Sequence, residues 1–379
     1  MTILDDRMDE FEKCIKLENK RYIPLEHIVT PEMALEYAGY SLFTGVWDVE
    51  VLLKALDKTI NDFDADYVRS LYFRSPRFYS TLGAKSFVQS PQGFVQHPEV
   101  HSMEPEEYDE FIIDPVKFLA EKCVPRIYTA LDKPEPYKSF ALAKGMHASN
   151  RIFGAYNAGV GKILQQAQLK SVCAVSTEAP FDFMADLIRS FTGISTDVRR
   201  HKDKVKAACE AVLPVMINKG LAVAPGIERL VHIPLHMPPF LNEKVFKELW
   251  WPTFKELVEK LVAEGHYLYI FFEGDWSRYY EYLTDLPKKR IMGRFEYADA
   301  KQIKTTLGDM MCLLGFYPLT LLANGTKEVC IDKAKEYIDI LAPGGGYVFN
   351  FDKITTSASD VKAENVHAVN KTVREYGKY

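Results

Sequence analysis

The sequence predicts an α/β fold with a parallel sheet, and it favours a closed barrel. From about residue 170 onward, short apolar runs alternate with helical patterns of roughly 10 to 20 residues. Apolar runs without polar alternation are typical of strands buried on both faces. Sustained alternation with helices indicates parallel strands joined by right-handed crossovers. No glycine-rich phosphate-binding motif follows any of the runs, which disfavours an open nucleotide-binding sheet.

The second half of the chain provides the regular elements. We expect strands near 171–177, 230–236, 267–273, 290–295, 310–316 and 347–351. Between and after them, helices are predicted near 180–191, 201–219, 242–264, 276–286, 299–307, 326–341 and 361–376. Residues 166–379 are therefore predicted to form regular βα repeats.

Residues 1–165 are rich in turn signals, and we expect an irregular elaboration that includes the first part of the barrel. Helices are predicted near 31–38, 49–62, 105–112 and 115–131. The last of these has Asp114 as its N-cap and Pro115 at its first helical position. The whole chain, 1–379, is predicted to be a single domain.

Composition excludes several classes of protein. The chain has 379 residues and a formal net charge of -5, without the clustered positive charge of a nucleic-acid binder. Neither a signal peptide nor an apolar run of ~18 residues is present, so we expect a cytoplasmic protein that does not enter a membrane. Its six cysteines are scattered, which indicates reduced thiols.

In a barrel, the chemistry belongs at the carboxyl ends of the strands. Glu273 ends an apolar strand, where an ionised carboxylate is costly unless a partner or a metal compensates it. His236 ends the preceding strand and shares a face with His232. Asp275 is either a helix cap or a ligand. The other residues at such positions are Glu178, Asp182, Glu296, Asn350 and Asp352.

Several segments resemble the uroporphyrinogen decarboxylase-like superfamily in order and spacing across roughly 170–379. They are Phe271-Phe272-Glu273-Gly274-Asp275, Leu314-Gly315, Gly325-Thr326-Lys327-Glu328-Val329, Gly344-Gly345-Gly346-Tyr347, Glu364-Asn365-Val366 and Arg374-Glu375-Tyr376-Gly377. The resemblance implies a (β/α)8 TIM barrel. It also implies one of two activities: decarboxylation without a cofactor, or corrinoid-dependent methyl transfer assisted by a metal, usually zinc.

The chain departs from both branches. The decarboxylases carry an arginine-rich amino-terminal segment, whereas Leu35-Glu36-Tyr37-Ala38-Gly39-Tyr40 keeps Ala-Gly and has no arginine. A porphyrinogen with eight carboxylates needs many cationic partners, so we expect no uroporphyrinogen decarboxylation. The zinc-binding His-x-Cys of the methyltransferases is replaced by Phe271 and Glu273.

A corrinoid-dependent methyltransferase of the superfamily is the function we predict. It would move a methyl group between a small methylated compound, plausibly an O-methyl aromatic, and the cobalt of a separate corrinoid protein. A rebuilt zinc site would use His236, Glu273 and Cys312, because strand alternation places Glu273 and Cys312 on the inward face.

The remaining roles follow from the same interpretation. Glu273, Asp275 and His236 are the predicted catalytic residues, and Glu178, Asp182, Phe271 and Phe316 the predicted substrate contacts. Partners are the corrinoid protein and a small methyl donor or acceptor, and a homodimer is allowed. The alternatives are a decarboxylase of a small carboxylate and a non-catalytic binding barrel.

Overall fold

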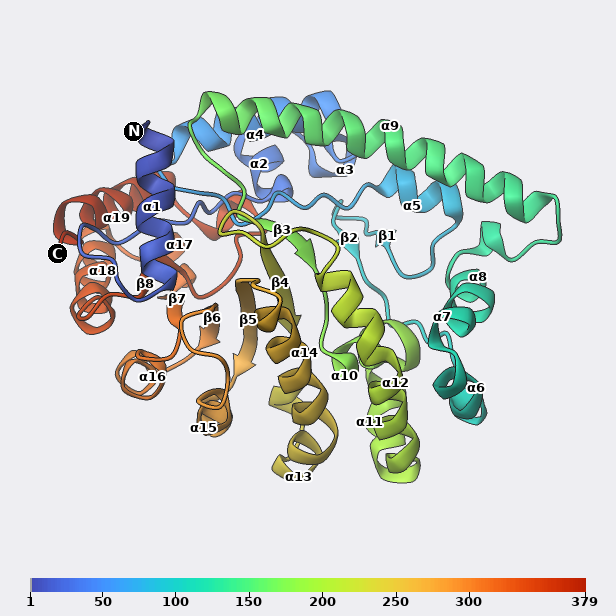
Figure 1. The fold of residues 1–379 in the computed structure, drawn as a ribbon. Coiled ribbons are helices and arrows are strands. Elements are labelled where there is room, and N and C mark those ends of the chain that lie inside the picture. The colour runs from blue at the N-terminus through green and yellow to red at the C-terminus, as the bar shows by residue number, and fades with distance from the viewer. Residues whose placement is uncertain (1) are drawn as a thin grey trace.

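The computed structural model describes residues 2–379, and its centre is a parallel sheet in which neighbours in sequence are neighbours in space (Figure 1). The strands are β3 Cys173–Ser176, β4 Leu230–Leu235, β5 Leu268–Asp275, β6 Ile291–Tyr297, β7 Cys312–Tyr317 and β8 Tyr347–Phe351. Every adjacent pair is parallel. This confirms the six predicted strands and their order.

Two short segments close the sheet into a (β/α)8 barrel. The segment around Leu25 lies beside β8, and the segment around Tyr67 lies between it and the start of β3. Backbone hydrogen bonds run from Phe349 N–H to the Pro24 carbonyl (2.9 Å) and from His27 N–H to the Tyr67 carbonyl (2.9 Å). The closing parallel bridges are Leu25 with Phe349, Glu26 with Tyr67 and Val68 with Ser171. The amino-terminal half thus supplies the first two barrel strands.

Helices surround the barrel. In the first half they are α1 Ile3–Ile15, α2 Pro31–Tyr37, α3 Leu42–Gly45, α4 Val49–Asp62, α5 Pro76–Leu82, α6 Tyr108–Ile113, α7 Pro115–Phe118, α8 Val124–Ile127 and α9 Tyr137–Gln166, with an antiparallel hairpin of β1 Val88–Gln89 and β2 Val95–Gln96. In the second half they are α10 Pro180–Phe183, α11 Ser190–Arg200, α12 Lys202–Gly220, α13 Glu243–Val245, α14 Trp251–Ala263, α15 Tyr280–Leu283, α16 Ala300–Leu307, α17 Leu319–Asn324, α18 Lys327–Leu341 and α19 Ala363–Tyr376.

The expectation of an irregular first half is wrong in one respect, because α9 is a helix of 30 residues. It runs along one side of the molecule over α4 and α5 (Figure 1). Glycines permit this close packing: a Cβ at Gly159 would overlap the side chain of Leu53, and one at Gly145 would overlap Leu82. The glycines that allow α9 to approach its neighbours are the residues that weaken its helical pattern in the sequence.

Helix α1 closes the amino-terminal end of the barrel. Phe11 and Cys14 of α1 belong to one apolar cluster with inward-facing strand residues, among them Met292, Cys312 and Val348. This plug leaves the carboxyl ends of the strands as the open end. Within residues 2–379, no helix has the length and apolar character needed to cross a membrane.

Candidate active site

An imidazole links two carboxylates at the open end of the barrel. His236 follows β4, and its Nδ1 lies 3.2 Å from Glu273 Oε2 on β5. On its other side, His236 Nε2 lies 3.9 Å from Asp186 Oδ2. The side chains of His236 and Glu273 are 41% and 43% exposed, so this chain of groups reaches solvent. The predicted proximity of Glu273 to His236 is confirmed.

Asp182 fixes the backbone that carries His236. Its buried carboxylate accepts hydrogen bonds from the backbone N–H of His236 (2.6 Å) and of Met237 (3.1 Å), and from the indole N–H of Trp250. These donors consume its acceptor capacity and leave it covered by protein. The prediction of Asp182 as a substrate contact is corrected: the residue is an anchor for the end of β4.

Local backbone features orient the two carboxylates. Asp186 lies in a π-helical turn, Met184–Arg189, and single π turns are frequent at functional sites. Glu273 lies where the register between β5 and β6 shifts. The next residue, Gly274, has φ +75°, and a Cβ there would come within 2.7 Å of Pro239. Its N–H donates to Glu296 (2.9 Å), which holds this bulge in place.

Burial favours protonation of both carboxylates. Desolvation raises the pKa of Asp186 to about 7, and the nearby carboxylates of Asp182, Glu178 and Glu273 add to the rise against the opposing effect of His236. Desolvation also raises the pKa of Glu273, opposed by His236. Asp186 can therefore retain a proton near neutral pH, and the raised pKa of Glu273 favours its protonated form, which could donate to a bound molecule.

The burial argument for Glu273 needs one correction. Its side chain is half-exposed rather than enclosed, because Ile270 and Phe272 point outward into the core between strands and helices. Phe271 shares the inward face of β5, as predicted, and Arg294 lies over its ring at 5.3 Å.

Three other predicted site residues have other partners. Asp275 is exposed and caps the turn that follows, accepting from Ser277 N–H at 2.9 Å. Glu178 pairs with Lys219 at 3.2 Å. Phe316 is buried in the outer core, where its ring stacks on Phe295 at 6.1 Å. Its predicted role as a substrate contact is therefore corrected to core packing.

Cys312 does not join His236 and Glu273. It begins β7, near the plugged end of the barrel, and its Sγ lies 3.6 Å from Sγ of Cys14. Strand alternation correctly places Cys312 on the inward face, but at a different depth from Glu273. Within residues 2–379, no group of three or more His, Cys, Asp or Glu side chains is arranged to hold a metal ion. The donor set therefore does not fit the predicted three-ligand zinc site.

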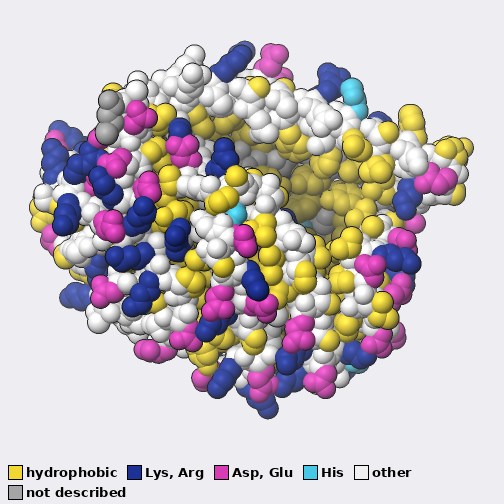
Figure 2. All heavy atoms as spheres, viewed as in Figure 1, with side chains coloured by type: hydrophobic (Ala, Val, Ile, Leu, Met, Phe, Trp, Pro, Cys, Tyr) yellow, Lys and Arg dark blue, Asp and Glu magenta, His cyan; other side chains and the backbone are white. Residues whose placement is uncertain are grey.

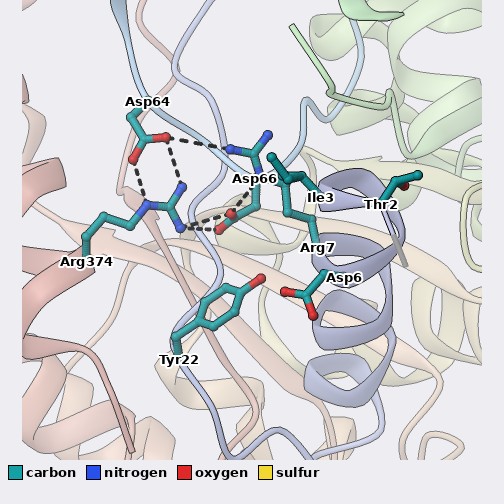
Figure 3. Close-up of a pocket in the computed structure, with 8 residues that line it drawn as sticks. All are labelled: Thr2, Ile3, Asp6, Arg7, Tyr22, Asp64, Asp66 and Arg374. Atoms are coloured by element: carbon teal, nitrogen blue, oxygen red, sulfur yellow. Dashed lines mark hydrogen bonds and ion pairs between the residues drawn. The ribbon is translucent and has the colours of Figure 1, made fainter.

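The molecule has a hollow on the side of α9 and a separate pocket near the plugged end of the barrel. Figure 2 shows a hollow beneath α9 whose walls are largely hydrophobic. A separate pocket lies near the plugged end, where Arg374 pairs with Asp64 (2.6 Å) and Asp66 (2.7 Å) and Arg7 reaches Asp66 at 3.4 Å (Figure 3). These ion pairs tie α1 and α19 to the start of the second barrel strand, which is a structural role.

Three charged residues of the interior were not among the site residues predicted from the sequence. Asp186 is one helical turn after Asp182, a spacing that places both at the end of β3. Arg294 and Glu26 lie inside the barrel with exposed fractions of 4% and 2%. Arg294 shows the same sequence pattern that identified Glu273, a charged residue within an apolar strand.

Comparisons with known proteins place the chain in a family. The family model for uroporphyrinogen decarboxylase (URO-D) matches residues 115–376, more than two thirds of the chain. A solved methyltransferase from Methanosarcina mazei superposes with a TM-score of 0.62 at 14% sequence identity, and the match covers 98% of each chain. No curated protein matches the sequence. With its parallel eight-stranded barrel and this match, the chain belongs to the uroporphyrinogen decarboxylase family.

Proposed function

We propose that this protein is a methyltransferase that demethylates a small methyl ether and passes the methyl group to the cobalt of a corrinoid on a separate protein. The observation that carries the proposal is the row of Asp186, His236 and Glu273 at the open end of the barrel, in which the imidazole lies 3.9 Å from the first carboxylate and 3.2 Å from the second. The fold likeness to a methyltransferase supports the same reaction class.

A methyl ether requires an acid because an alkoxide or phenolate is a poor leaving group. As the methyl–oxygen bond breaks, its electron pair stays on oxygen, and a proton from Glu273 converts that oxygen to a neutral hydroxyl. His236 lies between Glu273 and Asp186 and can restore the proton to Glu273. The corrinoid would supply the nucleophile that takes the methyl group.

The corrinoid would arrive on a partner protein. The sequence contains no Asp-x-His-x-x-Gly motif of the kind that holds a corrinoid. Helix α9 carries exposed apolar side chains near its beginning, Tyr137, Phe140, Leu142 and Met146. Exposed apolar patches of this kind are typical of surfaces that bind a partner.

The test uses purified protein, chemically reduced free cob(I)alamin and 3-methoxybenzoate or guaiacol as methyl donor. Formation of methylcobalamin is followed by absorbance, and the demethylated phenol by chromatography. Glu273→Gln should lower the rate by roughly 10²-fold or more, the usual contribution of a general acid. The matched control is Glu256→Gln on the exposed face of α14, which should leave the rate unchanged. Equal rates for the two variants would contradict the proposed role of Glu273.

A second candidate is decarboxylation of a small carboxylate, favoured by membership of the uroporphyrinogen decarboxylase family. Here the carbon–carbon bond breaks, CO₂ leaves, and the carbon that retains the electron pair takes the proton from Glu273. Release of CO₂ without cobalamin, from a carboxylate that yields no methylcobalamin, would favour this reaction over methyl transfer.

A further inference from the structure

A second polar cluster lies inside the barrel. It lines a narrow cavity between the carboxyl ends of β8 and the first two strands, and Arg294 reaches it from β6. Its charged side chains are Glu26, Arg69, Arg294 and Lys353. Arg294 and Glu26 are almost fully buried.

In the part of the chain that the structure describes, both the carboxylate of Glu26 and the guanidinium group of Arg294 have atoms without a hydrogen-bond partner. Glu26 Oε1 accepts from Asn350 Nδ2 (2.6 Å) and Tyr269 OH (3.2 Å) and lies 3.8 Å from Arg294 Nη1. Within residues 2–379, Glu26 Oε2 and Arg294 Nε are buried polar atoms without a hydrogen-bond partner, and both belong to residues that line the cavity. Unpaired buried polar atoms are costly and rare, so their clustering at one cavity indicates a missing binding partner.

The net charge of the residues that line the cavity indicates the charge of the missing partner. Lys353 has its own neighbours, Glu296 at 3.8 Å and the Tyr297 hydroxyl at 2.7 Å. Two guanidinium groups, Arg69 and Arg294, then face the single carboxylate of Glu26. Arg69 contacts the His232 ring (Nη1 to Nε2, 3.4 Å). Burial, with a further contribution from the guanidinium groups of Arg69 and Arg294, holds the pKa of His232 well below its ordinary value, so this ring adds no charge. The cavity therefore has an excess of one positive charge.

We infer that this cavity is a binding subsite for the carboxylate group of the substrate, with Arg69 and Arg294 as its cationic partners and Glu26 Oε2 accepting from a donor on the same molecule. The inference deepens the proposed function, because it gives the methyl donor a carboxylate. Arginine is suited to this role, since its planar donors match both oxygens of a carboxylate.

The position of the subsite fits a ligand that reaches the proton donor. Arg294 pairs with Phe271 in the β5–β6 register, and Glu273 is two residues further along the same inward face of β5. Two residues of strand span about 7 Å, which is comparable to the width of a single-ring aromatic acid. A ligand anchored at Arg294 would therefore place its far end near Glu273.

The test measures binding alone, so its outcome does not depend on methyl transfer. Benzoate and acetate are titrated into the protein at constant ionic strength by calorimetry, with benzamide and acetamide as neutral counterparts. We expect a carboxylate to bind and its amide not to bind. Arg69→Met should weaken carboxylate binding roughly tenfold or more, the loss of one charge-assisted contact.

Glu26→Gln should change carboxylate affinity in the opposite direction to Arg69→Met. It removes the one negative charge of the cavity while keeping similar shape, so carboxylate affinity should rise, which general damage to the fold would not produce. The control is Arg199→Met, an exposed arginine on α11, which should bind as wild type. The subsite is refuted if neither carboxylate binds, if amides bind equally well, or if Arg69→Met and Glu26→Gln both leave carboxylate affinity unchanged. If carboxylates bind as expected but methylcobalamin never forms, the subsite stands and the proposed methyl transfer fails.

Discussion

Replacing Asp186 by Asn should stabilise the protein at neutral pH and weaken one limb of its pH–rate profile. Desolvation raises the pKa of Asp186 from the ordinary value of 3.8 to about 7, so the folded protein resists ionisation of this group. Below pH 3.8 the carboxyl group is protonated in both folded and unfolded chains and costs nothing. As the pH rises from 3.8 to about 7, only the unfolded chain gains from ionisation, and stability falls until the folded-state pKa is passed.

The magnitude follows from the size of the pKa change. A rise from 3.8 to about 7 corresponds to about 4 kcal/mol between the two protonation states. The Asp186 side chain is 33% exposed, and solvent screening reduces the net effect to about 2 kcal/mol. Asn cannot ionise, so Asp186→Asn should be more stable than wild type by about 2 kcal/mol at pH 8, with no difference below about pH 4.

Urea denaturation followed by tryptophan fluorescence at pH 4, 6 and 8 measures this difference, and the free energy of unfolding should diverge between the two proteins as the pH rises. In the transfer assay, the wild-type rate should fall above about pH 7 as the proton is lost. That limb should be weakened in the Asp186→Asn variant. A variant that is less stable than wild type at pH 8, with an unaltered pH–rate profile, would refute the reasoning.

Four further predictions follow from the same geometry. Glu273→Gln should abolish methyl transfer. The midpoint of thermal unfolding, measured by calorimetry, should be unchanged or slightly higher, because burial already raises the pKa of Glu273. Retained activity with a lower midpoint would show a structural role. Asp182→Asn should destabilise the fold by ~2–3 kcal/mol in urea, since an amide cannot accept from all three donors now on the carboxylate. Cys312→Ser should leave metal content, measured by emission spectrometry, and activity as in wild type, because its neighbour is Cys14; a loss of bound zinc would restore the three-ligand site. Uroporphyrinogen should not be decarboxylated, and coproporphyrinogen detected by chromatography would contradict this.

The last of these predictions has a structural basis beyond the missing arginines. In the segment that replaces them, the Glu36 carboxylate accepts from the Ser357 hydroxyl (2.6 Å) and the Ala358 N–H (2.9 Å). This part of α2 therefore holds the loop after β8 rather than presenting positive charge to a ligand. The cavity inside the barrel carries two guanidinium groups, Arg69 and Arg294, which share the carboxylate of Glu26, too few for eight substrate carboxylates.

The long-range architecture could be predicted from the sequence, because each of the six regular strands is a long apolar run between strong helical patterns. The first two barrel strands could not be recognised in this way. Each pairs through isolated bridges, and polar residues, Glu26 and Arg69, fall within the short stretches that pair. Their strand conformation depends on β3 and β8 on either side, which no local pattern encodes.

The candidate site shows a similar division. Residue type and strand end were sufficient to pair His236 with Glu273, since adjacent parallel strands end at the same edge. Alternation alone could not place Cys312 at the depth of Glu273, because Cys312 shares the inward face but begins its strand. Asp182 and Asp186 are both acidic and one turn apart, and only the structure shows that backbone donors occupy the first while the second faces His236.

The alternation of side chains along a strand connects binding with proton transfer. On β5, Phe271 lies beside Arg294 and the inward residue that follows is Glu273; on β6, Arg294 itself is followed by Glu296, which holds the bulge behind Glu273. A shift of β6 by one residue against β5 would turn Arg294 away from the lumen while Glu273 kept its place. The register therefore fixes the backbone of Arg294 two strand residues from that of Glu273. A rigid substrate that spans from the guanidinium group to Glu273 would be held ready for protonation, whereas a shorter one would bind without reaching Glu273.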